Sequence, residues 1–393
     1  MSAGAGDGAR IHQTDHRRKE LSSRRTLLKA SVVAAGATLM AGCGGDDSAP
    51  ATTRPRGITV TDQRGKTIVF DQPVTRAVTI PIPAASMLIA IDGSPDRLVG
   101  MQEASWTAIR DGIMGTMFPA ALKVRHDVAN EEFAPNVESI LALDPDVVVQ
   151  WGDHGSEVIT PLENAGLTVL GLSYGTQADL TAWIRLFAAI TGQPERGRTI
   201  LSQIDARLRD TRSAGSAERG TPPKVLYFLR YADGLEVAGT ETYNDFYISL
   251  IGATNPATGS DAVQGFATVD VEQVLAWDPD IILLGNFDAA VPADVYRDDV
   301  WRAVSAVRTR RVYKVPFGGY RWDPPGQESP LMWRWLSDVA FAIQKGTRSD
   351  LRARIVSSYQ FLYRHTPDPS QIDDILWTDV NSGSSHYREL FSG

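Results

Sequence analysis

The chain has 393 residues, a formal net charge of −8 and a single cysteine, Cys43. An acidic protein is a poor partner for nucleic acid, and one cysteine leaves no internal disulfide and no metal site built from several thiolates. The length also exceeds that at which one hydrophobic core normally stops growing, so we expect two domains.

Residues 1–42 have the pattern of an export signal. The pair Arg24-Arg25 precedes a weakly apolar run over residues 30–41, which is typical of a twin-arginine signal. That run is shorter than the roughly 20 residues that a membrane-spanning helix needs. The segment Leu39-Met-Ala-Gly-Cys43 resembles a bacterial lipobox, in which cleavage leaves Cys43 as the acylated first residue. We therefore expect an exported protein held at the membrane by a lipid; the alternative is a soluble tail with a chance cysteine.

Loss of residues 1–42 would make the remaining chain more acidic. They hold seven Lys/Arg and three Asp/Glu, so the net charge would change from −8 by −(7 − 3) to about −12. Residues 43–57 are rich in small and helix-breaking residues and lack apolar periodicity, which predicts a flexible tether. Folding should begin near Ile58.

Residues 58–176 predict a lobe in which strands alternate with helices. The segment 58–70 has alternating apolar residues on both sides of a polar turn at Gly65, which predicts a β-hairpin. The other expected strands are 78–82, 98–101, 147–151 and 167–172, and the expected helices include 84–91 and 158–165. Such alternation favours a parallel sheet covered by helices on both faces.

The alternation stops at residues 177–213, which have a largely helical pattern and predict two helices, over 179–191 and 195–212. It resumes in a second lobe over residues 214–393. The expected strands there are 224–229, 281–284 and 311–315, and the expected helices are 244–251, 330–345 and 349–363. We therefore predict an α/β fold with two Rossmann-like β/α lobes, each built on a parallel sheet, joined by one long helix.

A fourteen-residue pattern occurs in both lobes, as Asn136–Val149 and as Asp270–Leu283. The copies are offset by 134 residues and share seven identical positions. Each copy predicts an Asn or Asp N-cap, a short helix, a proline stop and a buried β-branched strand. The expected apolar side of each helix carries three residues, Val137, Ile140 and Leu141 in the first copy and Val271, Val274 and Leu275 in the second. A repeat of this length is not a solenoid unit, and it indicates two lobes of like architecture.

Each copy also places one glutamate, Glu138 or Glu272, in the first helical turn. A carboxylate at this position complements the helix dipole and should face water. Helix-terminal acids with no further role are the simpler interpretation of either residue alone. Their equivalence in two lobes favours a shared function.

These motifs resemble the bacterial substrate-binding proteins of ABC importers for iron–siderophore, haem and cobalamin complexes. The matching segments are Ile58-Thr-Val-Thr-Asp-Gln-Arg-Gly65, Arg76-Ala-Val-Thr-Ile80, Asp96-Arg-Leu-Val-Gly100, both Val-Glu-x-x-Leu-Ala-x-Asp-Pro-Asp copies and the long inter-lobe helix. The resemblance covers essentially the whole region after the tether. It implies the helical-backbone class III fold, no cofactor and no chemistry. It also implies a monomer that delivers a small-molecule metal chelate to a permease dimer with its ATPase.

In proteins that this chain resembles, one glutamate of each lobe docks on arginines of the permease, and the matching residues here are Glu138 and Glu272. Two equivalent charges suit a two-fold symmetric partner. A surface sensor domain that binds the same ligand but reports to a signalling partner is an alternative, and the doubled glutamate argues for the permease.

The ligand should lie between the lobes, in loops at the carboxyl ends of the strands. Aromatic and cationic residues in such loops are the candidates: Trp106, Trp151 and His154 in the first lobe, and Arg230, Tyr231, Tyr243, Phe266, Phe287, Tyr320, Arg321 and Trp322 in the second. The run Tyr320-Arg321-Trp322 suits stacking on a planar chelate and pairing with an anion. Its Tyr-Arg-Trp-Asp-Pro-Pro context resembles a branch with members assigned to metal chelates or molybdate-type anions. Arg230 with Arg321 favours a ferric siderophore, while haem, cobalamin and molybdate stay open.

An enzyme is the least favoured class. The chain has no Gly-x-Ser-x-Gly elbow, no phosphate-binding Gly-x-x-x-x-Gly-Lys-Ser/Thr loop, no Gly-x-Gly-x-x-Gly and no His-Glu-x-x-His. A metal centre is not expected either. Only four histidines lie outside the export signal, and two of them, His365 and His386, are in the C-terminal tail.

Overall fold

The computed structural model describes residues 57–392 apart from 219, 233, 260, 261, 343–345 and 347. The predicted export signal, Cys43 and nearly all of the predicted tether lie outside the described residues. Contacts divide the chain into two units, residues 1–54 and 55–393, and both predicted lobes belong to the second unit. Within its described part, no helix is long and apolar enough to cross a membrane.

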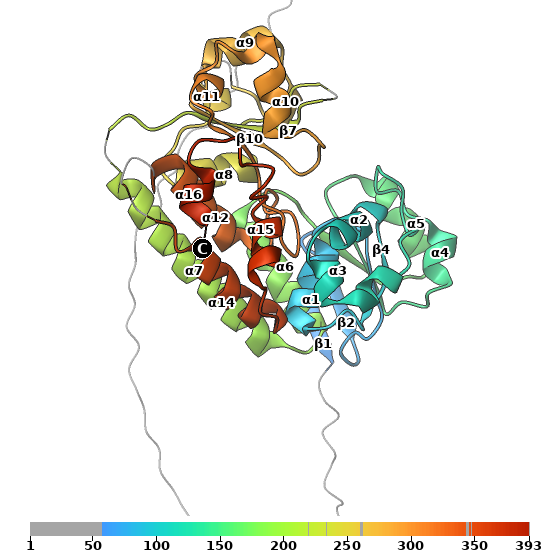
Figure 1. Cartoon of the computed structure of the whole chain (residues 1–393). Coiled ribbons are helices and arrows are strands. Elements are labelled where there is room, and N and C mark those ends of the chain that lie inside the picture. Colours follow the sequence, from blue (N-terminus) through green and yellow to red (C-terminus); the bar gives the residue numbers. More distant parts are fainter. Residues whose placement is uncertain are drawn as a thin grey trace, which may run out of the picture. The chain divides into compact units, whose positions relative to one another are not determined.

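The first lobe contains the predicted hairpin and a four-stranded sheet (Figure 1). In the hairpin, β1 (Ile58–Thr61) pairs antiparallel with β2 (Thr67–Phe70), and Gly65 turns the chain with a φ of 82°. The sheet has the order β4-β3-β5-β6, and all of its pairs are parallel. Its strands are β3 (Ala77–Thr79), β4 (Leu98–Met101), β5 (Val147–Trp151) and β6 (Val169–Leu172).

Short helices connect these strands. They are α1 (Ala84–Asp92), α2 (Glu103–Asp111), α3 (Met114–Met117), η1 (Pro119–Lys123), α4 (Val137–Leu141), η2 (Ser156–Val158) and α5 (Thr160–Asn164). The sequence did not predict α2, α3 or η1. The helix predicted over 158–165 is instead a 3-10 turn followed by α5, because Pro161 favours the first turn of a new helix.

Two helices carry the chain from the first lobe to the second. α6 (Gln177–Ile190) begins with a capping box between Thr176 and Asp179. α7 (Pro194–Ala217) has 24 residues, which corresponds to about 36 Å of helix. The two helices pack closely at Gly197, where a Cβ would lie 2.4 Å from the Cβ of Ala188. The predicted long helical connection is therefore present, while the domain boundaries at 176 and 213 stay predictions.

The second lobe contains a five-stranded sheet of order β11-β10-β7-β8-β9. β11, β10 and β7 are parallel as predicted, but β8 and β9 are antiparallel additions at one edge. The strands are β7 (Val225–Arg230), β8 (Glu236–Ala238), β9 (Phe266–Thr268), β10 (Ile281–Leu284) and β11 (Val312–Lys314). β8 and β9 have three residues each, which is too short to show a period in the sequence.

Helices surround this sheet and extend to the C-terminus. They are α8 (Tyr243–Leu250), η3 (Pro256–Thr258), α9 (Val271–Trp277), α10 (Pro292–Arg297), η4 (Asp299–Trp301), α11 (Ser305–Arg308), α12 (Ser329–Ser337), η5 (Asp338–Ala342), α14 (Leu351–Tyr363), α15 (Pro369–Ile375) and α16 (Tyr387–Phe391). The predicted helix 330–345 is divided, because α-helical geometry ends at Ser337 and a π-helical turn follows.

One hydrophobic core is shared by the two lobes. Along β5, Val147 and Val149 face this shared core, and Val148 faces a smaller cluster on the opposite side of the sheet. β7 alternates in the same way, with Tyr227 on the shared side and Phe228 on the other. Because the central core is continuous, the lobes are packed against each other and not merely linked.

Candidate ligand-binding cleft

The first lobe contributes an aromatic cluster at the carboxyl end of β5. The ring of His154 stacks on Trp151, the last residue of β5, at 5.0 Å and 14°. Tyr174 and Phe133 contact the same indole edge-on, with ring centroids at 5.7 and 6.0 Å. Trp151 is buried, and its Nε1 donor has no hydrogen-bond partner. His154 is exposed, with its Nδ1 2.9 Å from Asp153.

The second lobe contributes a cation from the loop that follows β11. The guanidinium of Arg321 lies over Phe287, 4.6 Å from the ring centroid, and 5.7 Å from that of Phe317. Its Nε donates a hydrogen bond of 3.0 Å to the carbonyl of Asn286. Its Nη1 is buried without a partner, and no ion pair to Arg321 occurs among the described residues. A partly buried guanidinium without a counter-ion favours an anion.

The two clusters meet where the lobes pack together. Tyr320, beside Arg321, is buried in a small cluster with Ala108 of the first lobe. Burial raises the pKa of Tyr320 to about 12, although the Arg321 guanidinium opposes the rise. Burial likewise raises the pKa of Tyr174, with a smaller contribution from Tyr320 across the lobe boundary. These tyrosines are therefore neutral hydrogen-bonding groups at neutral pH.

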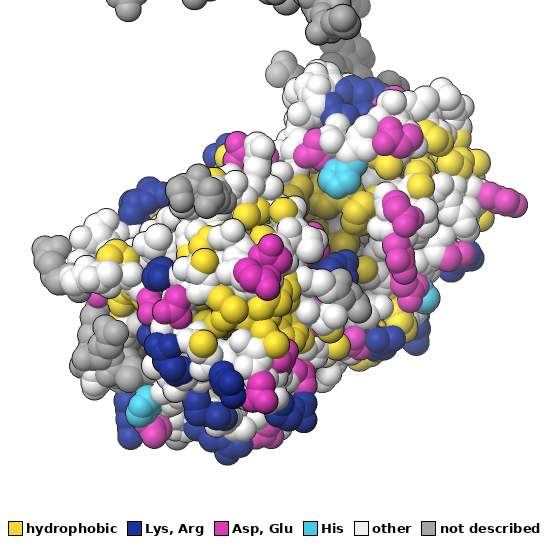
Figure 2. Space-filling model, turned by 90° about the horizontal axis from the view of Figure 1, so that it is seen from above, with side chains coloured by type: hydrophobic (Ala, Val, Ile, Leu, Met, Phe, Trp, Pro, Cys, Tyr) yellow, Lys and Arg dark blue, Asp and Glu magenta, His cyan; other side chains and the backbone are white. Residues whose placement is uncertain are grey.

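A hollow with largely hydrophobic walls lies between the lobes (Figure 2). Three buried donors of the two clusters have no hydrogen-bond partner: Trp151 Nε1 from the first lobe, and Tyr320 OH and Arg321 Nη1 from the second. Buried donors are normally satisfied, and each one left unpaired is destabilising by roughly 1–3 kcal/mol. The arrangement therefore suits a solute that brings acceptor oxygens.

Trp106 and Phe266 lie apart from these clusters. Trp106 is in α2, where it stacks on His126 at 4.4 Å and donates its indole N–H to the carbonyl of Leu122 at 3.1 Å. Phe266 is in the edge strand β9 and packs against the shared core. Both residues were expected in loops at the carboxyl ends of strands, whereas Trp106 lies in a helix and Phe266 in a strand.

Arg230 is the last residue of β7 and Tyr231 follows it directly, but both already have partners. Arg230 is exposed and pairs with Glu236 at 3.4 Å. The hydroxyl of Tyr231 accepts a hydrogen bond from the indole N–H of Trp301 at 2.8 Å. Arg321 is therefore the better anion-binding candidate of the two predicted arginines.

Tyr243 and Trp322 are buried in the core and already have polar partners, so they stay predictions as ligand contacts and are weaker candidates than Arg321. Both are at most 1% exposed. Tyr243 stacks on Phe246, and its hydroxyl donates to Gln177 at 3.2 Å. Trp322 donates its indole N–H to Glu328 at 2.7 Å. Both polar groups are thus already paired, unlike those of Trp151 and Tyr320.

Two aromatic residues of the first-lobe cluster were not predicted. Tyr174 lies two residues after β6, so the rule that found Trp151 also applies to it. Phe133 lies in the loop before α4 and contacts both Trp151 and His154. No sequence pattern marks Phe133, because it follows no strand.

A buried carboxylate supports the loop that carries Arg321. Glu328 accepts hydrogen bonds from Trp322 at 2.7 Å, from Tyr359 at 2.9 Å and from Tyr363 at 2.5 Å. Gly318 lies against the same group, since a Cβ there would be 2.2 Å from a carboxylate oxygen of Glu328. Burial raises the pKa of Glu328, and its three side-chain donors oppose the rise. Tyr359 and Tyr363 of α14 thus hold Glu328, and Glu328 in turn holds the loop through Trp322.

We predict that Glu328→Ala lowers the free energy of unfolding by roughly 3 kcal/mol or more, because three buried donors lose their acceptor. Glu328→Gln keeps an acceptor and serves as the control. Because the folded-state pKa of Glu328 is raised, its protonated form favours the fold, and this contribution is lost as the pH rises through that pKa. Urea unfolding from about pH 4 to about pH 8 should therefore show wild type losing stability relative to Glu328→Gln. A constant difference would contradict the prediction.

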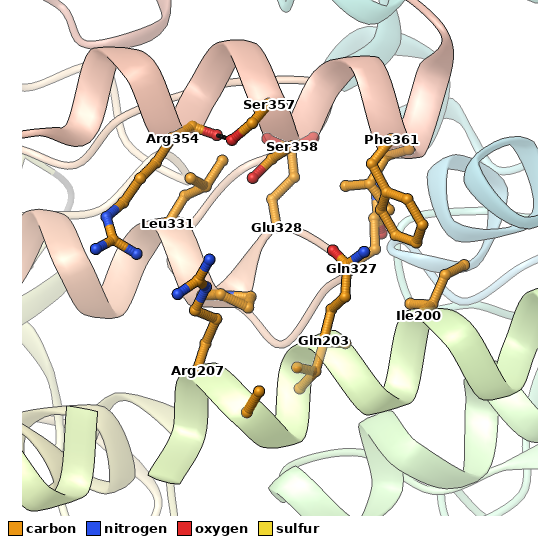
Figure 3. Close-up of a pocket in the computed structure, with 14 residues that line it drawn as sticks. Ile200, Gln203, Arg207, Gln327, Glu328, Leu331, Arg354, Ser357, Ser358 and Phe361 are labelled. Atoms are coloured by element: carbon orange, nitrogen blue, oxygen red, sulfur yellow. Dashed lines mark hydrogen bonds between the residues drawn. The ribbon is translucent and has the colours of Figure 1, made fainter. Parts of the chain in front are cut away.

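A separate cavity of about 480 Å³ lies between α7, α12 and α14 (Figure 3). Gln327 and Glu328 form part of its wall, and Arg207 and Arg354 lie at the opposite part. The described residues predicted to bind the ligand are not among those that line it. The inter-lobe hollow is therefore the candidate site, and this cavity lies behind its supporting loop.

Glu138 and Glu272 occupy equivalent positions in α4 and α9. Their helices begin at Asn136 and Asp270, whose side chains accept hydrogen bonds from the third backbone N–H that follows. Both glutamates are exposed, and neither forms an ion pair with another described residue. The expectation that they face water is therefore correct.

Two α/β lobes on a shared core, joined by a long helix and separated by a hollow, define a two-lobed solute-binding protein. No group of three or more His, Cys, Asp or Glu side chains in the described part of the chain is placed to hold a metal ion. Residues 86–317 match the periplasmic binding protein family, and the chain belongs to this family. Its relatives bind substrates for transport and are not enzymes.

Similar proteins include several with different solutes in their names. A periplasmic solute binding protein from Veillonella parvula is 32% identical, with a TM-score of 0.74 over 82% of this chain and 98% of that one. The molybdate-binding protein MolA of Haemophilus influenzae is 23% identical over 79% of this chain and 92% of its own length. A cobalamin-binding protein of Halobacterium salinarum is 24% identical over 61% of this chain and 69% of its own length. The chain is thus an extracytoplasmic solute-binding protein of the siderophore, cobalamin, molybdate and haem group of ABC importers.

Proposed function

We propose that this protein is lipid-anchored through Cys43 and captures an anionic metal chelate of the ferric siderophore type between its lobes for an ABC permease. The observation that carries the proposal is the set of three unpartnered donors, Trp151 Nε1, Tyr320 OH and Arg321 Nη1. They come from both lobes, so one solute that accepts from all three would bridge the hollow. The anchor would keep the loaded protein close to the importer.

The surroundings of Arg321 favour a chelate with flat or apolar parts. The guanidinium lies on Phe287, and His154 lies on Trp151, so aromatic faces flank the donors on both sides. Such faces can stack on the aromatic or amide groups that surround a chelated metal. A chelate with acidic oxygens would meet the donors and the aromatic faces together.

A compact oxyanion of the molybdate type is the second candidate. The same three donors suit it, and the similar protein MolA was solved with bound molybdate, with a TM-score of 0.68 at 21% identity. An ion of that size would leave the aromatic faces of Phe287 and His154 without a contact. For this reason we favour the larger anionic chelate. Haem and cobalamin are the further alternatives.

Titration of the intrinsic tryptophan fluorescence tests the proposal, because Trp151 is one of the three proposed donors. The purified protein would be titrated with ferric hydroxamate and catecholate siderophores, molybdate, tungstate, haem and cobalamin. We expect saturable quenching by at least one ferric siderophore. Saturation by molybdate alone would support the second candidate, and saturation by cobalamin alone would contradict an anionic ligand.

A further inference from the structure

Two leucines are exposed at equivalent positions of the two lobes. Four large hydrophobic side chains are strongly exposed among the described residues: Val69, Leu141, Leu275 and Val300. Leu141 and Leu275 are 48% and 37% exposed, and they differ by the same 134 residues that separate the repeat copies. Val69 lies in β2 and Val300 in η4, both outside the two copies of the repeat. Exposure of a large apolar residue is thus repeated between the lobes only at the leucines.

This exposure differs from the sequence-based expectation. Leu141 and Leu275 were expected on the buried side of their helices, next to Ile140 and Val274. Ile140 and Val274 are fully buried, as expected. α4 and α9 have only five and seven residues, so a single residue of each is enough to fix the helix to its lobe. The leucine that follows it then points away from the core.

Each exposed leucine lies beside a docking candidate. Leu141 follows Glu138 by three residues, and Leu275 follows Glu272 by three. Residues three apart lie on the same face of a helix, with Cβ atoms roughly 5–6 Å apart. Each lobe therefore presents one carboxylate and one leucine together on a short helix. We name these residues the two Glu–Leu pairs.

We infer that the two Glu–Leu pairs form the docking surface for the permease, with each leucine entering an apolar pocket next to a cationic group. This inference rests on the proposed function and adds an apolar contact to the charged contact expected at each glutamate. A partner that takes two equivalent pairs must itself have two equivalent sites, as a two-fold symmetric permease dimer has. The glutamates steer the encounter, and leucine burial holds the complex.

The test is binding of the full-length protein to its purified permease–ATPase complex in nanodiscs. Leu141→Ala and Leu275→Ala should each weaken binding about tenfold, and the double variant on the order of a hundredfold. Val69→Ala with Val300→Ala is the matched control, because it also removes two exposed apolar side chains. This control should bind the permease complex like wild type. Ferric siderophore titration and circular dichroism should be unchanged in all of these variants.

The outcomes separate this inference from the proposed function. If the leucine variants bind normally while Glu138→Lys with Glu272→Lys prevents binding, docking is by charge alone and the inference is wrong. An effect of one leucine without the other would also overturn it. If the glutamate and leucine variants all bind the permease complex normally, the permease does not dock on these helices, while capture of the solute, as proposed above, is unaffected. A similar loss in the valine control would show that the leucines have no special role.

Discussion

Arg321→Met should weaken the binding of an anionic solute by roughly 10- to 100-fold while leaving the fold intact. The guanidinium has an unpartnered Nη1 and no ion pair among the described residues, so the solute would be its counter-ion. Methionine keeps an unbranched stem of similar length against Phe287 but removes the charge and the donors. The loss should fall mainly on binding and not on stability.

Arg230→Met is the control for this prediction. It removes the same charge from the other arginine that the sequence predicts as a ligand contact. Arg230, however, is exposed and already paired with Glu236 at 3.4 Å. An exposed ion pair contributes little, so we expect solute affinity to change less than about twofold. Both variants would be titrated with a ferric siderophore at low and high salt. Equal losses in the two variants, or none in Arg321→Met, would contradict the assignment of Arg321.

The architecture could be predicted because the apolar periodicity of the sequence indicates the strands and helices, and the repeat indicates two similar lobes. Buried strands such as β5 and β10 are largely apolar runs that follow a helix and a proline in both copies of the repeat. The strands β8 and β9 could not be predicted, since three residues show no period and their pairing depends on distant partners. α2 was missed because only Ser105, Ala108 and Ile109 of its nine residues are buried.

The site was predicted only in part, for a related reason. Trp151 ends strand β5 and Arg321 lies in the loop after β11, and a position near the carboxyl end of a strand can be read from the sequence. The direction in which a side chain points cannot be read from the sequence. Of the consecutive residues Tyr320, Arg321 and Trp322, only the last turns inward to Glu328. The other donors to Glu328 are Tyr359 and Tyr363, which lie more than thirty residues further along the chain. The local sequence therefore gives no sign of this cluster.

The double charge reversal Glu138→Lys with Glu272→Lys should abolish uptake of the solute while leaving its binding unchanged. Both side chains are exposed and have no ion-pair partner among the described residues, so their replacement should change the free energy of unfolding little. A lysine in the first turn of each helix opposes the helix dipole, which is destabilising by roughly 0.3–1 kcal/mol per site. Two like charges brought against permease cations are destabilising by several kcal/mol, which is enough to prevent docking.

Uptake of labelled ferric siderophore by cells that carry the importer measures the effect, and fluorescence titration of the purified variant measures solute binding. Asp96→Lys with Asp205→Lys is the control, since it changes the net charge equally at two exposed acids outside the repeat helices. If this control also stops uptake, the effect comes from net charge and not from docking. Normal uptake by the Glu138 and Glu272 variant would exclude these carboxylates as the contact with the permease. Loss of uptake in that variant alone, with solute affinity retained, assigns the equivalent carboxylates to delivery and leaves capture to the hollow between the lobes.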